Sequence, residues 1–210
     1  SDGQPHGTRS FKNYTTWSLW DTYRSFHPLA TLIYPDYQYD WYQSMLHINR
    51  EQGFLPIWHL MGNETFCMVG ISSVPVLSDM FLKGFVKKED REEVYRAMVS
   101  TMNRPFRDVD TFNVYGYVPY NHASEDVAKS LEYGLDCWSL AQVAAKLGKK
   151  NDYVTYSRRA LAYCHLYDKE TGFMRGKSTD GKWRTPFDPK RSDHRENTDY
   201  TEGNAWQHSW

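Results

Sequence analysis

Apolar residues recur along this chain at the spacing of amphipathic helices. In residues 125–147 they return at intervals of four and three, and Gly148 follows as a C-terminal glycine should. Residues 150–168 repeat the pattern after a gap of two residues, which predicts an antiparallel helical hairpin. No segment shows sustained two-residue alternation, so we expect helices rather than half-buried strands.

A second pair of helices is predicted near the start of the chain. The first helix covers residues 14–26 and is expected to end before Pro28. The second covers residues 36–52 and is expected to end at Gly53. Together they predict another hairpin.

A third pair lies between these two. Residues 65–82 carry an apolar stripe that Pro75 is expected to kink, and residues 89–102 carry another. A seventh helix is predicted to begin near Thr201, with Ala205, Trp206 and Trp210 in the core.

The segments between the pairs predict a pocket on a helical scaffold. Residues 104–122 and 171–200 are rich in glycine, proline, aspartate and aromatic residues, which is typical of loops that line a site. The predicted fold class is all-α, with about three hairpins and the start of a seventh helix arranged as part of an α/α toroid. Because this seventh pattern stops at residue 210, we expect the chain to be part of a longer domain.

Composition narrows the function. The 210 residues include 25 basic and 26 acidic side chains, a balance that argues against binding nucleic acid or an anionic membrane surface. No apolar run is long enough to span a membrane. Aromatic residues make up 16% of the chain, and their faces either pack a core or support flat ligands such as sugar rings. Cys67, Cys137 and Cys164 are expected to be buried free thiols.

Several carboxylates stand among aromatic residues. Asp21 follows Trp20 and either binds a ligand or pairs with Arg24 one helical turn away. Glu64 is placed in the first turn of a predicted helix, where the helix dipole favours a carboxylate for structural reasons alone. Both alternatives stay open for each residue.

Two further acidic segments are also candidates, and the one at Glu202 carries the most weight. Glu132 and Asp136 lie four residues apart on one helix face, which calls for a cation or a ligand between them unless that face is solvated. Glu202 lies at a predicted helix start beside Gly203 and Trp206. A glutamate among aromatic side chains can have its pKa raised by desolvation, as a general acid near neutral pH requires.

Five ordered segments resemble glycoside hydrolase family 92, a family of calcium-dependent, exo-acting α-mannosidases. The resemblance covers almost the whole chain. It rests on residues 14–24 (YTTWSLWDTYR) with 27–29 (HPL), 62–65 (GNET), 130–136 (SLEYGLD), 172–175 (GFMR) and 201–207 (TEGNAWQ).

This resemblance implies an internal part of an (α/α)6 toroidal catalytic domain. In the family a β-sandwich domain precedes the toroid, and we expect residues 1–210 to contain neither that sandwich nor the second half of the toroid. The implied reaction removes terminal, often α-1,2-linked, mannose from N-glycans or mannans with inversion. Inversion needs a carboxylic acid at the leaving oxygen and a carboxylate that activates water on the opposite face.

The resemblance also implies roles for individual residues. Glu202 matches the position of the general acid. Calcium is implied in the sugar site, and we expect its ligands and the general base beyond Trp210. Substrate binding, in the pocket or behind it, is implied for seven further residues: Trp20, Asp21, Trp58, Glu64, Glu132, Asp136 and Trp206.

Three hypotheses about function follow. The first is a secreted, periplasmic or cell-surface α-mannosidase of which this chain is a part, any export signal lying upstream or having been removed. The second is a mannose-binding remnant without catalysis. The third is a helical scaffold, which predicts structural partners for Asp21, Glu64 and Glu202 alike. The partners expected for the first are mannose-containing glycans and the remainder of the domain.

Overall fold

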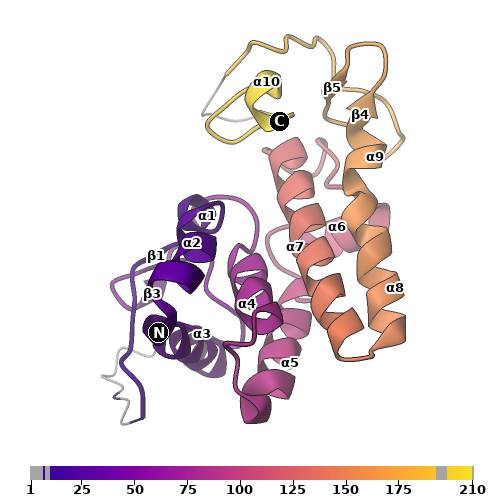
Figure 1. Cartoon of the computed structure of the whole chain (residues 1–210). Coiled ribbons are helices and arrows are strands. Elements are labelled where there is room, and N and C mark those ends of the chain that lie inside the picture. The colour runs from indigo at the N-terminus through magenta and orange to yellow at the C-terminus, as the bar shows by residue number, and fades with distance from the viewer. Residues whose placement is uncertain (1–6, 8–9, 193–197, 210) are drawn as a thin grey trace.

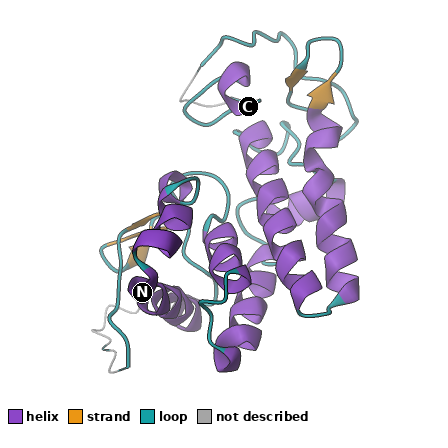
Figure 2. Cartoon of the chain, viewed as in Figure 1, coloured by secondary structure: helices purple, strands orange, loops and turns teal. Residues whose placement is uncertain are grey.

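The computed structural model describes residues 7, 10–192 and 198–209, and helices dominate it (Figures 1 and 2). The α-helices are α1 (Leu19–Thr22), α2 (Phe26–Ile33), α3 (Gln38–Gln52), α4 (Ser73–Leu82), α5 (Arg91–Met102), α6 (Val109–Tyr115), α7 (Asp126–Lys146), α8 (Lys150–Arg159), α9 (Tyr163–Leu166) and α10 (Ala205–His208). The 3-10 helices are η1 (Pro35–Tyr37), η2 (Lys88–Asp90) and η3 (Ala160–Ala162). The strands are β1 (Trp17–Ser18), β2 (Trp58–Leu60), β3 (Asn63–Glu64), β4 (Tyr167–Asp168) and β5 (Phe173–Met174).

Helix α7 is the centre of the packing. It lies antiparallel to α8 on one side and packs against α4 on the other (Figure 1). Tyr133, Cys137, Leu140 and Ala144 recur at intervals of three or four and are completely buried, as expected for a helix whose apolar face lies in the core. The predicted hairpin of residues 125–147 and 150–168 is therefore confirmed.

The second helix of that hairpin ends in a different form from the one predicted. After α8, η3 includes the non-helical Leu161 (φ −83°, ψ 17°), and α9 stops at Leu166. Tyr167 and Asp168 then form β4, which pairs antiparallel with β5. The helical prediction for residues 150–168 holds up to residue 166.

Pro28 and Pro75 do not play the roles that the sequence pattern predicted. Residues 14–26 do not form one helix, because Trp17–Ser18 is a strand, α1 is a single turn, and α2 begins at Phe26. Pro28 therefore lies in the first turn of α2, just as Pro75 lies in the first turn of α4. Amides in a first turn have no acceptor within the helix, so proline is tolerated there.

The remaining N-terminal helices agree better with the sequence pattern. Residues 36–52 give η1 and α3, which ends at Gly53 in the left-handed conformation (φ 83°). Residues 89–102 give part of η2 and all of α5. Residues 65–72 precede α4 as a loop, so the predicted helix over 65–82 begins eight residues late.

The sequence pattern missed the strands and one helix. β1, β2 and β3 form an antiparallel sheet in that order, with Trp17 opposite His59 and His59 opposite Glu64. These strands have two or three residues, which is too short for a two-residue period to register. α6 lies inside the segment 104–122 that we predicted to be a loop.

Some individual expectations are wrong. Cys137 is buried, but Cys67 and Cys164 are exposed, and all three are free thiols. α10 begins after Asn204, whose side chain caps it, rather than near Thr201. Ala205 is buried as predicted, whereas Trp206 is 49% exposed; Trp210 lies outside the described residues.

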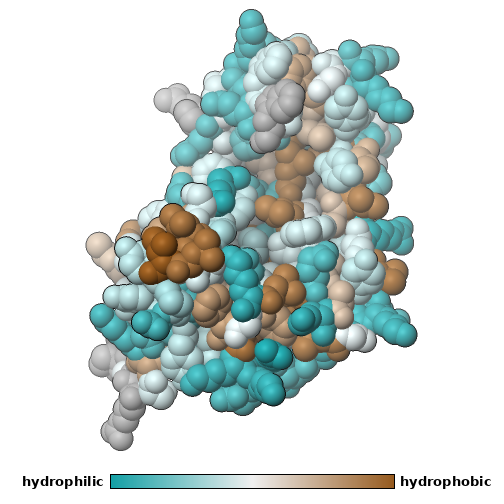
Figure 3. Space-filling view, in the orientation of Figure 1, coloured by the Kyte–Doolittle hydropathy of each residue, from teal (hydrophilic) through white to brown (hydrophobic). Residues whose placement is uncertain are grey.

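The surface carries an apolar patch on α2, formed by Leu29, Leu32 and Ile33 (Figure 3). Leu32 is 75% exposed. Among the described residues, no helix combines the length and the apolar character that crossing a bilayer requires.

The central position of α7 predicts unequal effects for two leucines of this helix. Leu140→Ala should lower the free energy of unfolding by about 3 kcal/mol, because a completely buried side chain leaves a cavity. Leu135→Ala, at a position 37% exposed, should lower it by about 1 kcal/mol or less. Urea-induced unfolding of the chain measures both values, and equal losses would contradict the central role of this helix face.

Candidate active site

Glu132 is the centre of a cluster of aromatic and charged side chains. It lies in the second turn of α7 and is buried. Its carboxylate accepts hydrogen bonds from Trp20 Nε1 (3.0 Å), the Tyr23 hydroxyl (2.8 Å) and Arg24 Nη2 (2.7 Å). These donors come from α1 and the turn after it, so the fold brings the predicted residues Trp20 and Glu132 into contact. The alternative of a solvated helix face at Glu132 is wrong.

Arg24 is the cation of this cluster. Its guanidinium carbon lies 5.1 Å from the centroid of the Trp20 ring and 4.7 Å from that of the Tyr23 ring. The alternative that paired Arg24 with Asp21 is wrong, because Arg24 pairs with Glu132. Asp21 is exposed and accepts a hydrogen bond from the Ser18 hydroxyl.

Asp136 lies one helical turn after Glu132 and is completely buried. One carboxylate oxygen accepts a hydrogen bond from the Ile71 amide (2.8 Å), and the other has no partner in the part of the chain that the structure describes. Burial raises the pKa of Asp136 well above its ordinary value, and the charge of Glu132 raises it further. The carboxyl is therefore poorly suited to carry a charge in the folded protein.

The loop before α4 covers both carboxylates. Gly70 has φ 79°, and a Cβ at this position would lie 2.8 Å from Glu132 Cβ. Only glycine allows the backbone to approach α7 so closely in this conformation. The loop thus excludes solvent from Asp136 and from one side of Glu132.

Glu64 has a structural environment different from the predicted one. It lies in β3 rather than in a helix, and its carboxylate accepts hydrogen bonds from the amides of Ile57 (2.7 Å), Trp58 (2.9 Å) and Phe66 (2.9 Å). By accepting hydrogen bonds from these three amides, the Glu64 carboxylate stabilises the backbone around the β2–β3 turn. The helix-start interpretation of Glu64 is wrong, although the interpretation as a structural carboxylate fits.

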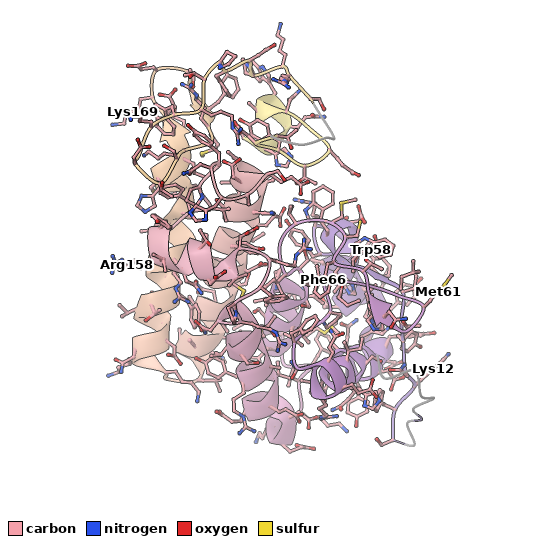
Figure 4. All side chains as sticks on the ribbon, turned by 180° about the vertical axis from the view of Figure 1, so that it is seen from behind. Lys12, Trp58, Met61, Phe66, Arg158 and Lys169 are labelled. Atoms are coloured by element: carbon pink, nitrogen blue, oxygen red, sulfur yellow. The ribbon has the colours of Figure 1, made fainter. Side chains whose placement is uncertain are left out.

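Trp58 is half-buried in β2. Figure 4 shows Trp58 and Met61 on the side of the molecule away from Arg158 of α8. The Trp58 indole nitrogen is buried and has no hydrogen-bond partner among the described residues.

Glu202 lies in the loop before α10, next to Thr201, which contacts the N-cap residue of α7. Its side chain is exposed, and its backbone adopts the left-handed conformation (φ 49°). No hydrogen bond or ion pair involves this carboxylate within the described residues 7, 10–192 and 198–209. Among the residues that the structure describes, none desolvates Glu202 as we expected, because its side chain is exposed. Trp206 is also exposed and packs edge-on against Phe173, with 5.0 Å between ring centroids.

Helix α7 relates Glu202 to the Glu132 cluster. The Thr201 hydroxyl, next to Glu202, donates to Glu125 Oε1 (2.9 Å) at the N-cap of α7. Glu132 follows Glu125 by seven residues, which is about 10 Å along a helix axis. Both groups therefore lie at the same end of α7, where Figure 1 also shows α10.

A second charged cluster was missed by the sequence analysis. Arg184 pairs with Asp126 (3.0 Å) and with Asp199, both of which are buried. Burial raises the pKa of Asp126 well above its ordinary value, with the charge of Asp199 adding to the effect and Arg184 opposing it. No linear signal could have found this cluster, because its members lie in a helix start and in two parts of a long loop. A pocket of about 50 Å³ lies beside it, lined by residues that include Arg184, Asp199 and Gly203.

The described residues do not fit a calcium site by themselves. No group of three or more histidine, cysteine, aspartate or glutamate side chains that could hold a metal occurs among them. The Glu132 oxygens accept hydrogen bonds from three side chains, and a guanidinium lies between Asp126 and Asp199. A hard cation needs six to eight oxygen ligands, which these carboxylates do not offer.

Asp136 should make stability depend on pH. Above pH 3.8, its ordinary pKa, the unfolded chain releases a proton that the folded chain retains, so stability falls as pH rises towards the raised pKa. The slope of this fall is up to about 1.4 kcal/mol per pH unit. Asp136→Asn keeps an acceptor for the Ile71 amide and removes the titration.

The variant should therefore be more stable than the wild type at pH 7, and the two should converge below about pH 4. Urea-induced unfolding between pH 3 and pH 8 measures the difference, with the exposed Asp110→Asn as control. Parallel pH curves for Asp136→Asn and the wild type would contradict the assignment.

Comparisons with known proteins agree on one family. The model of the glycosyl hydrolase family 92 catalytic domain matches residues 1–210. The GH92 α-mannosidase BT3965 from Bacteroides thetaiotaomicron is 43% identical, with a TM-score of 0.89 over 98% of this chain and 27% of that chain. Its complex with mannoimidazole gives 42% identity and a TM-score of 0.90 over 98% and 28% of the two chains. No curated protein matches.

A further solved structure supports the assignment. The inverting GH92 mannosidase BT2199 from Bacteroides thetaiotaomicron VPI-5482 is 34% identical, with a TM-score of 0.83 over 93% of this chain and 27% of that chain. This chain thus spans less than a third of the length of the solved chains it matches. The matches confirm the predicted fold class, all-α and part of an (α/α)6 toroid. The chain belongs to glycosyl hydrolase family 92.

Proposed function

We propose that the full-length polypeptide containing this chain is an exo-acting α-mannosidase that removes terminal α-linked mannose with inversion. The observation that carries the proposal is the match over nearly the whole chain to GH92 enzymes, one described as an α-mannosidase and another as an inverting mannosidase. The mannoimidazole bound to one of these relatives supports a mannose-like substrate. The substrates proposed are N-glycans or mannans with terminal α-1,2 linkages.

Glu202 is the proposed general acid. It is the one candidate carboxylate without a hydrogen bond or ion pair among the described residues, whereas Asp21, Glu64, Glu132 and Asp136 all accept hydrogen bonds. A free, exposed carboxylate beside Gly203 has room to reach a glycosidic oxygen. The base that activates water would lie roughly 6.5–9.5 Å away, and we propose that it comes from outside residues 1–210.

The other site residues divide by exposure. Asp21 is exposed and has a carboxylate oriented by Ser18, which suits an acceptor for sugar hydroxyls. Trp20 is held by Glu132, and its ring, with Trp58 and Trp206, would supply apolar faces to the sugar. Glu64, Glu132 and Asp136 would act from behind these side chains by holding the segments that carry them.

The geometry also separates the enzyme from a purely structural protein. A helical scaffold without a small-molecule site would have structural partners for Asp21, Glu64 and Glu202 alike. Glu64 has three backbone donors, but Glu202 has no partner in the described part of the chain. This difference favours a site at Glu202. Because the proposed substrates are extracellular glycans, we also propose that the protein acts outside the cytoplasm, secreted, periplasmic or at the cell surface.

Substitution of Glu202 tests the acid role. In the full-length polypeptide, Glu202→Gln should lower kcat on α-1,2-mannobiose by about 100-fold or more, because general acid catalysis contributes about that much. The same variant should lose far less activity on 2,4-dinitrophenyl α-mannoside, whose leaving group needs no proton.

The control is Glu170→Gln, which removes an exposed carboxylate in the β4–β5 turn and should leave both rates unchanged. Equal activity of Glu202→Gln and wild type on the mannobiose would remove Glu202 from the acid role. Mannose binding without hydrolysis by the wild type would instead support a mannose-binding remnant.

Calcium dependence is proposed on the resemblance to the family, with ligands from outside the described residues. When bound, calcium would coordinate sugar hydroxyls and polarise them. Dialysis of the full-length polypeptide against a chelator should abolish mannose release, and added Ca²⁺ should restore it where Mg²⁺ does not. Mannose release that persists in excess chelator would show that the enzyme works without calcium.

A further inference from the structure

A four-residue segment, residues 198–201, crosses the N-terminal end of α7. The Thr198 carbonyl accepts a hydrogen bond from the Glu125 amide (2.5 Å), and the Asp199 carbonyl accepts one from the Ala128 amide (3.0 Å). Amides at the start of a helix have no acceptor within it. The 198–201 segment therefore caps α7 with its own main chain.

Ion pairs of Arg184 with Asp199 and with Asp126 hold this segment against α7. The Asp199 carboxylate pairs with Arg184 and accepts a hydrogen bond from the Gly176 amide (3.3 Å), while Arg184 also pairs with Asp126 of α7. A Cβ at Gly176 would lie 2.7 Å from Asp199 Oδ1 and 2.9 Å from Asp126 Oδ2. The Gly176 backbone thus fills the space between the two carboxylates. The cluster therefore leaves no room for an ion and instead holds the 198–201 segment against α7.

Thr201, which directly precedes the proposed acid Glu202, is held in place by hydrogen bonds. It is buried, its hydroxyl donates to Glu125 Oε1 (2.9 Å), and its carbonyl contacts His208 Nε2 (2.9 Å). On the other side of Glu202, the Asn204 amide donates to Gln207 Oε1 (3.0 Å) in the capping box of α10. Glu202 therefore lies between two anchored residues.

The backbone of Glu202 needs such anchors. Its φ of 49° lies in the left-handed region, which is unfavourable for a residue with a side chain. Conformations of this kind persist only where the surroundings impose them, and they cluster at functional sites. With the anchors on both sides, the left-handed turn directs the Glu202 side chain away from the core and into solvent.

We propose that Thr201 is a positioning residue for Glu202, acting through its hydrogen bond to Glu125 at the N-cap of α7. This inference rests on the proposed role of Glu202 as general acid. A proton donor must lie within hydrogen-bond reach of the leaving oxygen, and a displacement of about 1 Å can cost about 100-fold in rate. The Thr201–Glu125 hydrogen bond attaches the residue before Glu202 to the rigid helix α7, and so limits the movement of Glu202.

The test compares two substitutions at Thr201 in the full-length polypeptide. Thr201→Val keeps the shape and removes the hydroxyl donor; Thr201→Ser keeps the donor. Thr201→Val should lower kcat on α-1,2-mannobiose about 10-fold or more with KM unchanged, and should change kcat on 2,4-dinitrophenyl α-mannoside less than twofold. Thr201→Ser should remain within about twofold of wild type on both substrates.

Two further variants keep the test decisive. Glu125→Met removes the acceptor from the α7 side and should reproduce the leaving-group dependence of Thr201→Val, even if the valine variant folds poorly. Asp108→Asn breaks another ion pair to α7, Lys129–Asp108 (2.8 Å), away from the 198–201 segment, and should leave both rates unchanged.

Each result bears on the inference separately from the proposed function. Equal losses on both substrates, or no loss on either, in both Thr201→Val and Glu125→Met would overturn the positioning role. A normal rate of Glu202→Gln on the mannobiose would instead overturn the acid role on which the inference rests. A leaving-group-dependent loss in both Glu202→Gln and Thr201→Val supports both.

Discussion

A carboxylate taken out of water must receive hydrogen bonds, and Glu132 of α7 receives them from residues more than a hundred positions earlier in the chain. Trp20, Tyr23 and Arg24 all donate to it. Without these donors a charge would be buried unpaired, at a cost of several kcal/mol. The requirement ties the N-terminal segment to the central helix and orients the Trp20 ring. A polar interaction, rather than apolar packing alone, therefore determines where this part of the site lies.

The same helix carries the second half of the candidate site at its N-terminal end. Residues 198–201 accept its first amides, so the Glu202 turn is attached to a rigid element although it belongs to a long loop. Functional groups are held more accurately on helices and strands than on free loops. Helix α7 thus serves as a common frame for two groups of residues that approach it from opposite ends of the sequence. The middle of α7 is buried between α4 and α8, which restricts the movement of the helix.

The features that could be predicted from the sequence were the long helices whose apolar residues recur periodically. The helix over residues 125–147 was found because its apolar face repeats over six turns. Pro28 and Pro75 were misread as a stop and a kink, since proline is equally acceptable in a first turn, and the pattern alone does not say which side of it is helical. Two-residue strands carry no period at all. The family resemblance pointed to Trp20 and Glu132 separately, but their hydrogen bond spans 112 positions and depends on the tertiary fold.

The cap on α7 has a consequence for biosynthesis. Glu125 and Thr201 are separated by 76 positions, so the ribosome completes the whole of α7, α8 and the following loop before the residues that satisfy the first amides of α7 are made. During that interval the apolar middle of the helix can already pack, but its first turn has only water as an acceptor. The first turn of α7 therefore receives its main-chain acceptors only after residues 198–201 have been made, later than the core around the middle of the helix.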